Sequence, residues 1–509
     1  MQRPPLIQYA VYSDPGYRAY RGNPFIEALP SPLDNRTVAR LLKEDIDYRP
    51  EDCREPAHIR LHALQDILFW RWPTALHFDL QQRFSVMIRT GYRGRNPLHK
   101  AFWDDVRAGR QFLKQQSIPL QRETESTSTG FAIIGDSGTG KTCAVKNVLA
   151  LYPQLIIHTR YDDQEFNRLQ IVYVIVQCPP KGGLVALCHN FFRQVDKILG
   201  STDYFNVYTR KGQARLAEMV GNMYTIAQVH GIGVIVIDEI QNLTEAKEND
   251  AEAMLNFFVQ LVNDLCLPIV PVGTPKAIGV LSSAFRQARR VSGQGDCFVK
   301  RMKPGEDWDL FIKKMWCYQY LQHPVKLTPE LSEALYYESQ GIIDLVIKVF
   351  ILAQIRAITT GNEIMREVLT EQTIHSVSDS LMLLQPMLSA IRSGNEEALK
   401  LYKDLYEAIT INTQIQQALL KLPVSLLASV PLENSSIPDN VNRPNTLLPT
   451  PNKESSKKPK KSPTKQKQLV YQGGVLDVVL QGRADGITPY DALLKANYVQ
   501  NLDTYQEVN

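Results

Sequence analysis

The chain has 509 residues, which is long for one compact core, and usual domain sizes predict two to four units. Hydrophobic residues make up 44% and aromatic residues 9%, which excludes disorder of the whole chain. With 57 Lys and Arg against 53 Asp and Glu, the net charge of +4 argues against a uniformly basic nucleic-acid-binding protein but leaves a locally basic surface open.

No segment points to a membrane or to secretion. No run approaches the roughly 18–20 apolar residues that span a bilayer, and the first residues lack the apolar core of a signal peptide. The seven cysteines are widely spaced and include no CxxC pair, which argues against a disulfide framework or a zinc cluster. We therefore expect free thiols in a reducing cytoplasm and no membrane partner.

Residues 1–120 mix apolar stretches with proline-containing breaks and are treated as an N-terminal region. Residues 121–304 alternate two patterns. Four runs that are apolar nearly throughout predict strands of a parallel sheet buried on both faces: Gly130–Ile134, Val172–Gln177, Val234–Ile237 and Pro268–Val272. Helical patterns between and after them predict a doubly wound α/β core: Thr142–Leu151, Leu184–Leu199, Arg215–His230 and Ala253–Leu265.

The last two hundred residues change character twice. Residues 305–420 lack strand runs and carry helical spacing, which predicts a helical domain. Residues 421–468 are proline-rich, lysine-rich in their second half and free of aromatic residues, which predicts a flexible, disordered linker. Residues 469–509 regain aromatic and branched residues but are too few for a stable core, so we expect a docking segment that orders on a partner.

The clearest motif reads G-x-x-x-x-G-K-T, follows an apolar strand and opens a helix. Its glycines let backbone N–H groups turn toward phosphate, and the helix N-terminus adds a positive dipole end. Lys141 would reach the β and γ phosphates of ATP, and the Thr142 hydroxyl would bind Mg²⁺. The predicted nucleotide-binding residues are Gly135, Asp136, Ser137, Gly138, Thr139, Gly140, Lys141 and Thr142.

Acidic and polar residues end two later strands. Asp238 closes the run that begins at Val234 and could hold Mg²⁺ beside the phosphate loop, while Glu239 could polarise the attacking water. Thr274 follows the run that ends at Val272, and it either senses the γ-phosphate or caps the next helix.

Three arginines follow in a helical pattern, and on a helix they share one face: Arg286, Arg289 and Arg290. They suit an arginine finger donated to the nucleotide of a neighbouring subunit, because a planar guanidinium bridges phosphate oxygens. The alternative is a solvated basic face.

A phosphate loop, an Asp-Glu pair, a polar strand end and arginines ahead of a helical domain together resemble the AAA+ ATPases. That resemblance implies an AAA+ P-loop sheet with a helical lid over 305–420. AAA+ lids often carry a Gly-x-x-Arg sequence, whereas Gly341–Asp344 ends in an acid here, with Lys348 one turn further on.

Segments outside the ATPase motifs are similar to TnsC, the target-selection regulator of TnsABC-type transposons, including CRISPR-associated ones. The matching segments are Tyr20–Pro30, Phe84–Pro97, Met254–Val259 and Ser339–Asp344. The resemblance covers about residues 8–400.

The resemblance implies a bacterial, cytoplasmic, DNA-associated ATPase with ATP and Mg²⁺ as cofactors. It implies a homo-oligomer, either a ring of six or seven subunits or a helical filament, on double-stranded DNA. A target selector of the TniQ or TnsD type would mark the site, and we expect the C-terminal tail to meet the TnsA/TnsB transposase. Hydrolysis would reset the assembly.

DNA contact would come from loops that leave the sheet, and the candidates are Lys181, Arg210 and Lys211. Solvated loop charges are the alternative for each. The lysines between 453 and 467 could also grip DNA or stay solvated. A basic cluster in the second TnsC-like segment could contact DNA or a selector, or be paired within the fold: Arg83, Arg89, Arg93 and Arg95.

Two other functions fit parts of this pattern. One is an AAA+ replication initiator or helicase loader, which the TnsC-like segments argue against. The other is a scaffold that binds ATP without hydrolysing it, which the intact Glu239 argues against.

Overall fold

The computed structural model describes residues 2–100, 102–104, 130–180, 183–200, 202–209, 216–245, 262, 266–278, 281, 294–364 and 367–393. The chain divides into two units, Met1–Leu426 and Leu427–Asn509, and every described residue belongs to the first. The predicted linker and docking segment lie outside the described residues.

A five-stranded parallel sheet forms the centre of the fold, in the order β5-β6-β7-β2-β8. Its strands are β2 (Ile133–Gly135), β5 (Tyr173–Gln177), β6 (Val234–Asp238), β7 (Ile269–Gly273) and β8 (Cys297–Val299). The four predicted strands and the α/β class are confirmed. The sequence did not predict β8, because this three-residue edge strand exposes Phe298 and has no long apolar run.

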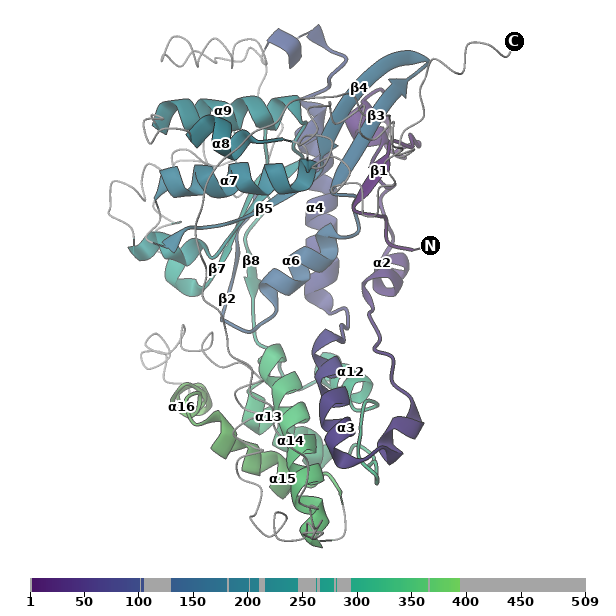
Figure 1. The fold of residues 1–509 in the computed structure, drawn as a ribbon, viewed down its shortest axis with the longest axis vertical. Helices are drawn as coiled ribbons and strands as arrows, with labels where there is room; N and C mark the ends of the chain where they lie inside the picture. The colour runs from purple at the N-terminus through teal and green to yellow at the C-terminus, as the bar shows by residue number, and fades with distance from the viewer. Residues whose placement is uncertain are drawn as a thin grey trace, which may run out of the picture. The chain divides into compact units, whose positions relative to one another are not determined.

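Helices cover both faces of this sheet, so its strands alternate between two apolar cores (Figure 1). On one face, Ile235 and Ile237 pack with α7 (Leu184–Leu199) and α9 (Leu216–Val229). On the other face, Val234 and Val236 pack with α4 (Ala75–Arg93) and α6 (Lys141–Leu149). The helices expected from 142, 184 and 215 are thus confirmed, and α8 (Tyr204–Thr209) adds a short helix beside α7. The helix expected over Ala253–Leu265 falls almost wholly outside the described residues.

A second, smaller sheet was not predicted from the sequence. It has the order β1-β3-β4 and consists of β1 (Ile7–Tyr9), β3 (Leu155–Tyr161) and β4 (Gln164–Ile171). β1 runs parallel to β3, and β3 pairs antiparallel with β4. Because β1 and β3 are about 150 residues apart in sequence, their pairing depends on tertiary packing that no local pattern encodes.

The first two TnsC-like segments contact each other directly. Asn23, which caps α1 (Pro24–Glu27), donates through Nδ2 to the carbonyl of Tyr92 near the end of α4, at 2.8 Å. Asn96 donates back to the carbonyl of Gly22, also at 2.8 Å. The rings of Phe25 and Tyr92 lie 5.5 Å apart in the same contact. These two segments therefore form one structural element, with η1 (Arg18–Tyr20) and α2 (Asn35–Leu42) beside it.

The arginines of the second segment are mostly used inside the fold. Arg89 and Arg95 are each 2% exposed. Arg89 donates to Ser85 and to the carbonyl of Pro30, and Arg95 donates to the carbonyl of Ile232, which precedes β6. Arg83 pairs with Asp79 and binds two backbone carbonyls. Arg83, Arg89 and Arg95 are thus paired within the fold, whereas Arg93 is exposed.

Helices form all the regular structure from residue 306 to residue 393 among the described residues. They are α12 (Glu306–Met315), α13 (Pro329–Ser339), α14 (Ile343–Ile364), α15 (Glu371–His375), η7 (Ser376–Leu381) and α16 (Gln385–Ser393). The helical domain is thus confirmed over this range. The apolar pattern that begins at Trp308 continues to Leu321, but the helix ends at Met315 and Leu321 is buried in the following turns.

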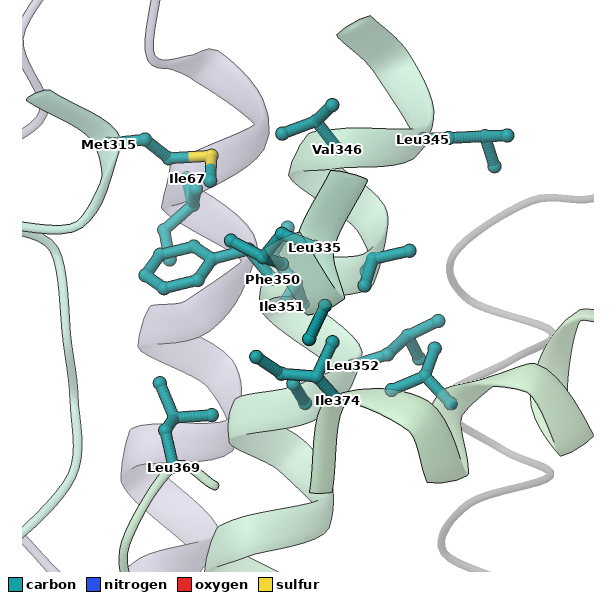
Figure 2. Packing of buried hydrophobic residues seen from close by; sticks show 14 of the residues in the cluster. Ile67, Met315, Leu335, Leu345, Val346, Phe350, Ile351, Leu352, Leu369 and Ile374 are labelled. Atoms are coloured by element: carbon teal, nitrogen blue, oxygen red, sulfur yellow. The ribbon is translucent and has the colours of Figure 1, made fainter. Parts of the chain in front are cut away.

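Part of the N-terminal region packs into these helices. η2 (Pro50–Arg54), α3 (Ala57–Ala63) and η3 (Leu64–Phe69) precede α4 in the chain, and Leu64, Ile67 and Trp70 belong to the apolar core of the helical region. Figure 2 shows Ile67 beside Met315 and Phe350. The first hundred residues therefore contribute to the core beside α4 and α6 and to the core of the helical region.

A buried ion pair fixes this crossing. Arg60 on α3 makes a bidentate contact with Glu367, at 2.6 and 2.9 Å, and the two side chains are 1% and 4% exposed. Arg60 also donates to the carbonyls of Glu55 and Tyr320. These hydrogen bonds and the ion pair offset the cost of burying the Arg60 charge, which would be high without a partner.

No helix among the described residues is long and apolar enough to cross a membrane. All seven cysteines are free, and five of them are buried, as expected for core thiols.

Replacing Glu367 with glutamine should lower the free energy of unfolding by about 3–5 kcal/mol, because the buried Arg60 charge loses its partner. Asp14→Asn is the control: it breaks the exposed pair with Arg21 and should leave stability unchanged. Urea denaturation followed by tryptophan fluorescence measures both. Equal stability of the two variants would contradict this account of the Arg60–Glu367 pair.

Candidate nucleotide-binding site

The predicted phosphate loop joins β2 to α6 as the sequence indicated. Gly138 and Gly140 adopt positive φ angles of 75° and 87°, which glycine accommodates without strain. Gly140 is the N-cap of α6, so the helix N-terminus faces the loop. The ammonium of Lys141 lies against the loop and donates to the carbonyls of Gly135 and Asp136 at 2.8 and 2.7 Å. The loop thus combines inward-turned backbone, a helix dipole and a buried cation.

The acidic pair lies at the end of β6, next to this loop. Thr142 Oγ1 donates to Asp238 Oδ1 at 3.2 Å, which brings the loop hydroxyl and the strand-end carboxylate together. Asp238 is 3% exposed, whereas Glu239 is half-buried and lines the same cavity. Glu239 has a φ of 59°, a left-handed conformation that is unfavourable for a residue with a side chain. Strain of this kind is found at functional sites, where the surrounding structure holds it in place.

Sequence reasoning missed Gln241, which links Glu239 to Thr274. Its amide nitrogen donates to a Glu239 carboxylate oxygen, and its amide oxygen accepts from the Thr274 backbone N–H at 3.2 Å. Thr274 precedes η6 (Pro275–Ala277), but its side chain makes no capping hydrogen bond. Its Oγ1 is buried without a partner among the described residues. The Thr274 side chain therefore does not cap η6.

The helical region contacts the loop at the fourth TnsC-like segment. The Asp344 N–H, in the first turn of α14, donates to the Gly138 carbonyl at 3.2 Å. Lys348 pairs with the Asp344 carboxylate at 2.6 Å. Gly341 sits at a φ of 70°, and a Cβ there would lie 1.9 Å from the Met302 carbonyl oxygen, so only glycine fits this crossing. Arg301 approaches Asp136 of the loop at 3.7 Å.

A cavity of about 330 Å³ unites these groups. Part of its wall is polar and comes from the phosphate loop, Asp238, Glu239 and Thr274. Another part is largely apolar, and its residues come from the N-terminal region and the helical region: Leu68, Trp70, Trp72, Leu76, Phe311, Ile343 and Ile347. Phosphates are anionic and a nucleobase is flat and apolar on its faces, so this division suits a nucleotide. Residues 68–77 could not be assigned to this site from the sequence, because they carry no phosphate-binding motif.

The remaining predicted site residues are outside the described part of the chain. These are the finger candidates Arg286, Arg289 and Arg290 and the DNA-contact candidates Lys181, Arg210 and Lys211. Their roles stay predictions.

Gln241 can pack against Gly273 because glycine has no Cβ. A Cβ at this position would lie 2.6 Å from Ile240 Cγ2 and 2.7 Å from Gln241 Oε1. Gly273→Ala should destabilise the protein by about 1–3 kcal/mol, as overpacking does, and should displace Gln241 from Glu239 and Thr274. The control is Gly183→Ala, where nothing lies within 4 Å of the added carbon and φ is −72°. Thermal denaturation and ATP turnover test the pair, and wild-type behaviour of Gly273→Ala would refute the close fit.

Comparisons with known proteins give one family match and several distant structural likenesses. Residues 124–281 match the family model described as an AAA domain. Among solved structures, the Walker-type ATPase of Pyrococcus abyssi is 12% identical, with a TM-score of 0.34, 63% of this chain covered and 88% of that chain. The ORC2 protein of Aeropyrum pernix is 14% identical, with a TM-score of 0.33 and coverages of 67% and 89%. A RuvB mutant of Thermotoga maritima is 14% identical, with a TM-score of 0.28 and coverages of 65% and 85%.

These structural likenesses are too distant to say what this chain does. A comparison with curated proteins gives no match. The matched segment contains the phosphate loop, the Asp-Glu pair and Thr274. Residues 124–281 therefore match an AAA domain and carry the P-loop motif, within an AAA+-like α/β fold.

Proposed function

We propose that this protein binds ATP with Mg²⁺ and hydrolyses it in the cavity described above. The observation that carries the proposal is the contact between Thr142 and Asp238, because it joins an oxygen donor from the phosphate loop to one from the strand end. Hard oxygen donors of this kind are what Mg²⁺ prefers beside nucleotide phosphates, so the residues present fit the ion. Thr142 and Asp238 would hold it, and it would neutralise charge on the phosphates.

The other residues of the cavity then have separate tasks. Lys141 exchanges its carbonyl contacts for phosphate oxygens. Glu239 accepts a proton from the attacking water, and its left-handed backbone and the Gln241 amide fix where its carboxylate points. Thr274 Oγ1, buried and unpaired among the described residues, offers a hydroxyl to the terminal phosphate or to that water.

We further propose that the ATPase regulates DNA transposition in the manner of TnsC. Three of the four TnsC-like segments lie within the described residues, and their arrangement supports the proposal. Tyr20–Pro30 and Phe84–Pro97 bind each other, and Ser339–Asp344 touches the phosphate loop. These three segments are thus part of the same folded unit as the proposed nucleotide site, and one of them contacts the phosphate loop.

The proposed partners follow from the same role. The protein would assemble as a ring or filament on double-stranded DNA and link a TniQ- or TnsD-type target selector to the TnsA/TnsB transposase. Hydrolysis would dissolve assemblies that meet no transposase. Arg286, Arg289 and Arg290 would supply the finger between subunits, and Lys181, Arg210 and Lys211 would contact DNA phosphates.

Glu239→Gln should lower ATP turnover by about 10²- to 10⁴-fold, the usual contribution of a general base, while leaving nucleotide binding intact. Assemblies on duplex DNA should therefore persist in ATP, as seen by electron microscopy, whereas wild-type assemblies dissolve over time. Glu165→Gln, an exposed glutamate on β4, is the matched control and should behave as wild type.

Three outcomes decide between the functions considered. If neither wild type nor Glu239→Gln assembles on DNA in ATP, the transposition-regulator proposal fails. Stable wild-type assemblies without turnover would support the non-hydrolysing scaffold instead. Full turnover by Glu239→Gln would remove Glu239 from the reaction.

A further inference from the structure

His77 is the third residue of α4 and lines the cavity near its apolar wall. The nearby lining includes Trp70, Trp72 and Leu76. The same stretch of the lining also includes the polar residues Arg71 and Thr74, so the imidazole is one of a few polar groups beside these apolar side chains. The roles proposed above for the loop, the acidic pair and Thr274 make no use of it.

The hydrogen bonds of His77 fix which ring nitrogen carries the proton. Nδ1 accepts from the backbone N–H of Thr74 at 3.2 Å and lies 3.0 Å from the Thr74 hydroxyl. A backbone N–H can only donate, so Nδ1 is unprotonated and the single proton of a neutral imidazole sits on Nε2. Burial lowers the pKa of His77 to about 4, so the ring is neutral at ordinary pH. Nε2 is therefore a permanent donor, and it has no partner among the described residues.

A donor fixed in this way discriminates between purines. If the faces of a bound base lie against the apolar side chains, a polar group of the lining beside that contact can meet the edge of the base. On the Watson–Crick edge, N1 of adenine accepts a hydrogen bond, whereas N1 of guanine carries a proton and cannot. A site whose buried donor finds no acceptor rejects that ligand strongly.

We propose that His77 determines base specificity by donating its Nε2–H to N1 of adenine. This inference rests on the proposed ATP binding and adds to it the residue that selects adenine over guanine. Trp72 and Leu76 supply apolar surface, and Thr74 holds the ring in the donating tautomer by occupying Nδ1. The phosphate loop binds the triphosphate whichever base is attached.

The test compares His77→Phe with His77→Gln in the full chain. Phenylalanine keeps a planar ring and removes both nitrogens, whereas glutamine keeps a donor and can also accept from Thr74 N–H, as it does in capping boxes. Equilibrium titration gives the dissociation constants of ATP, GTP, 1-deaza-ATP, 7-deaza-ATP and tripolyphosphate. Tripolyphosphate has no base, so it reports the phosphate loop alone.

We expect wild type to bind ATP more tightly than GTP or 1-deaza-ATP by about tenfold or more, the effect of one lost hydrogen bond. His77→Phe should weaken ATP binding by about the same factor, abolish the preference and leave tripolyphosphate binding unchanged. His77→Gln should restore part of the preference. The wild-type preference should stay constant between pH 6 and pH 8, because the pKa of His77 is about 4.

Several results would overturn the assignment. If His77→Phe weakens ATP and tripolyphosphate equally, His77 only supports the start of α4. If 7-deaza-ATP binds poorly to wild type and 1-deaza-ATP binds well, the donor does not read N1. Failure of wild type to bind either ATP or tripolyphosphate would instead refute the proposed ATP site, and the two failures are therefore distinguishable.

Discussion

The buried contact between Arg60 and Glu367 is the constraint on which the nucleotide cavity depends. It anchors residues 50–72 among the helices after residue 305, while α4 directly afterwards packs on the central sheet. Residues 70–77, where the chain passes from the helical region to α4, therefore line the cavity. One ion pair, with two further carbonyl acceptors for Arg60, thus determines where the apolar wall of the site lies.

The polar groups of the site form a chain of contacts, in which each group restricts the position of the next. The Thr142 hydroxyl donates to Asp238, and the next residue, Glu239, has a left-handed backbone. The Gln241 amide hydrogen-bonds both Glu239 and the Thr274 backbone N–H. Gly273 provides the space for Gln241, and Asp344 brings α14 against the loop. A change in the helical region can therefore reach the phosphate loop through a single backbone hydrogen bond. The helical region thus contacts the phosphate loop at Asp344, the position where AAA+ lids often carry an arginine.

Local patterns in the sequence predicted most of the core and one half of the site. Apolar runs identified β2, β5, β6 and β7, and the spacing of glycines, Lys141 and Thr142 identified the loop, since these signals lie within a few residues of one another. The pairing of β1 with β3 and the packing of α3 and η3 on the helical region were not predictable, because the partners are far apart in sequence. Trp70, Trp72 and His77 look like ordinary core residues in sequence, and only the fold brings them to the phosphate loop. Charge alone likewise could not show that Arg89 and Arg95 are buried in the fold while Arg93 is exposed.

The separation of Arg60 from Glu367 also has a consequence for synthesis of the protein. The two residues are 307 positions apart, so α3 emerges from the ribosome long before its partner exists. At about 5–20 residues per second, the interval is roughly 15–60 seconds, during which the phosphate loop and its sheet can already form. The apolar side chains Leu64, Ile67 and Trp70 and the Arg60 charge must stay solvated or chaperoned for that time. A complete nucleotide cavity can therefore close only late in translation, which keeps a nascent chain from acquiring its ligand before the helical region is made.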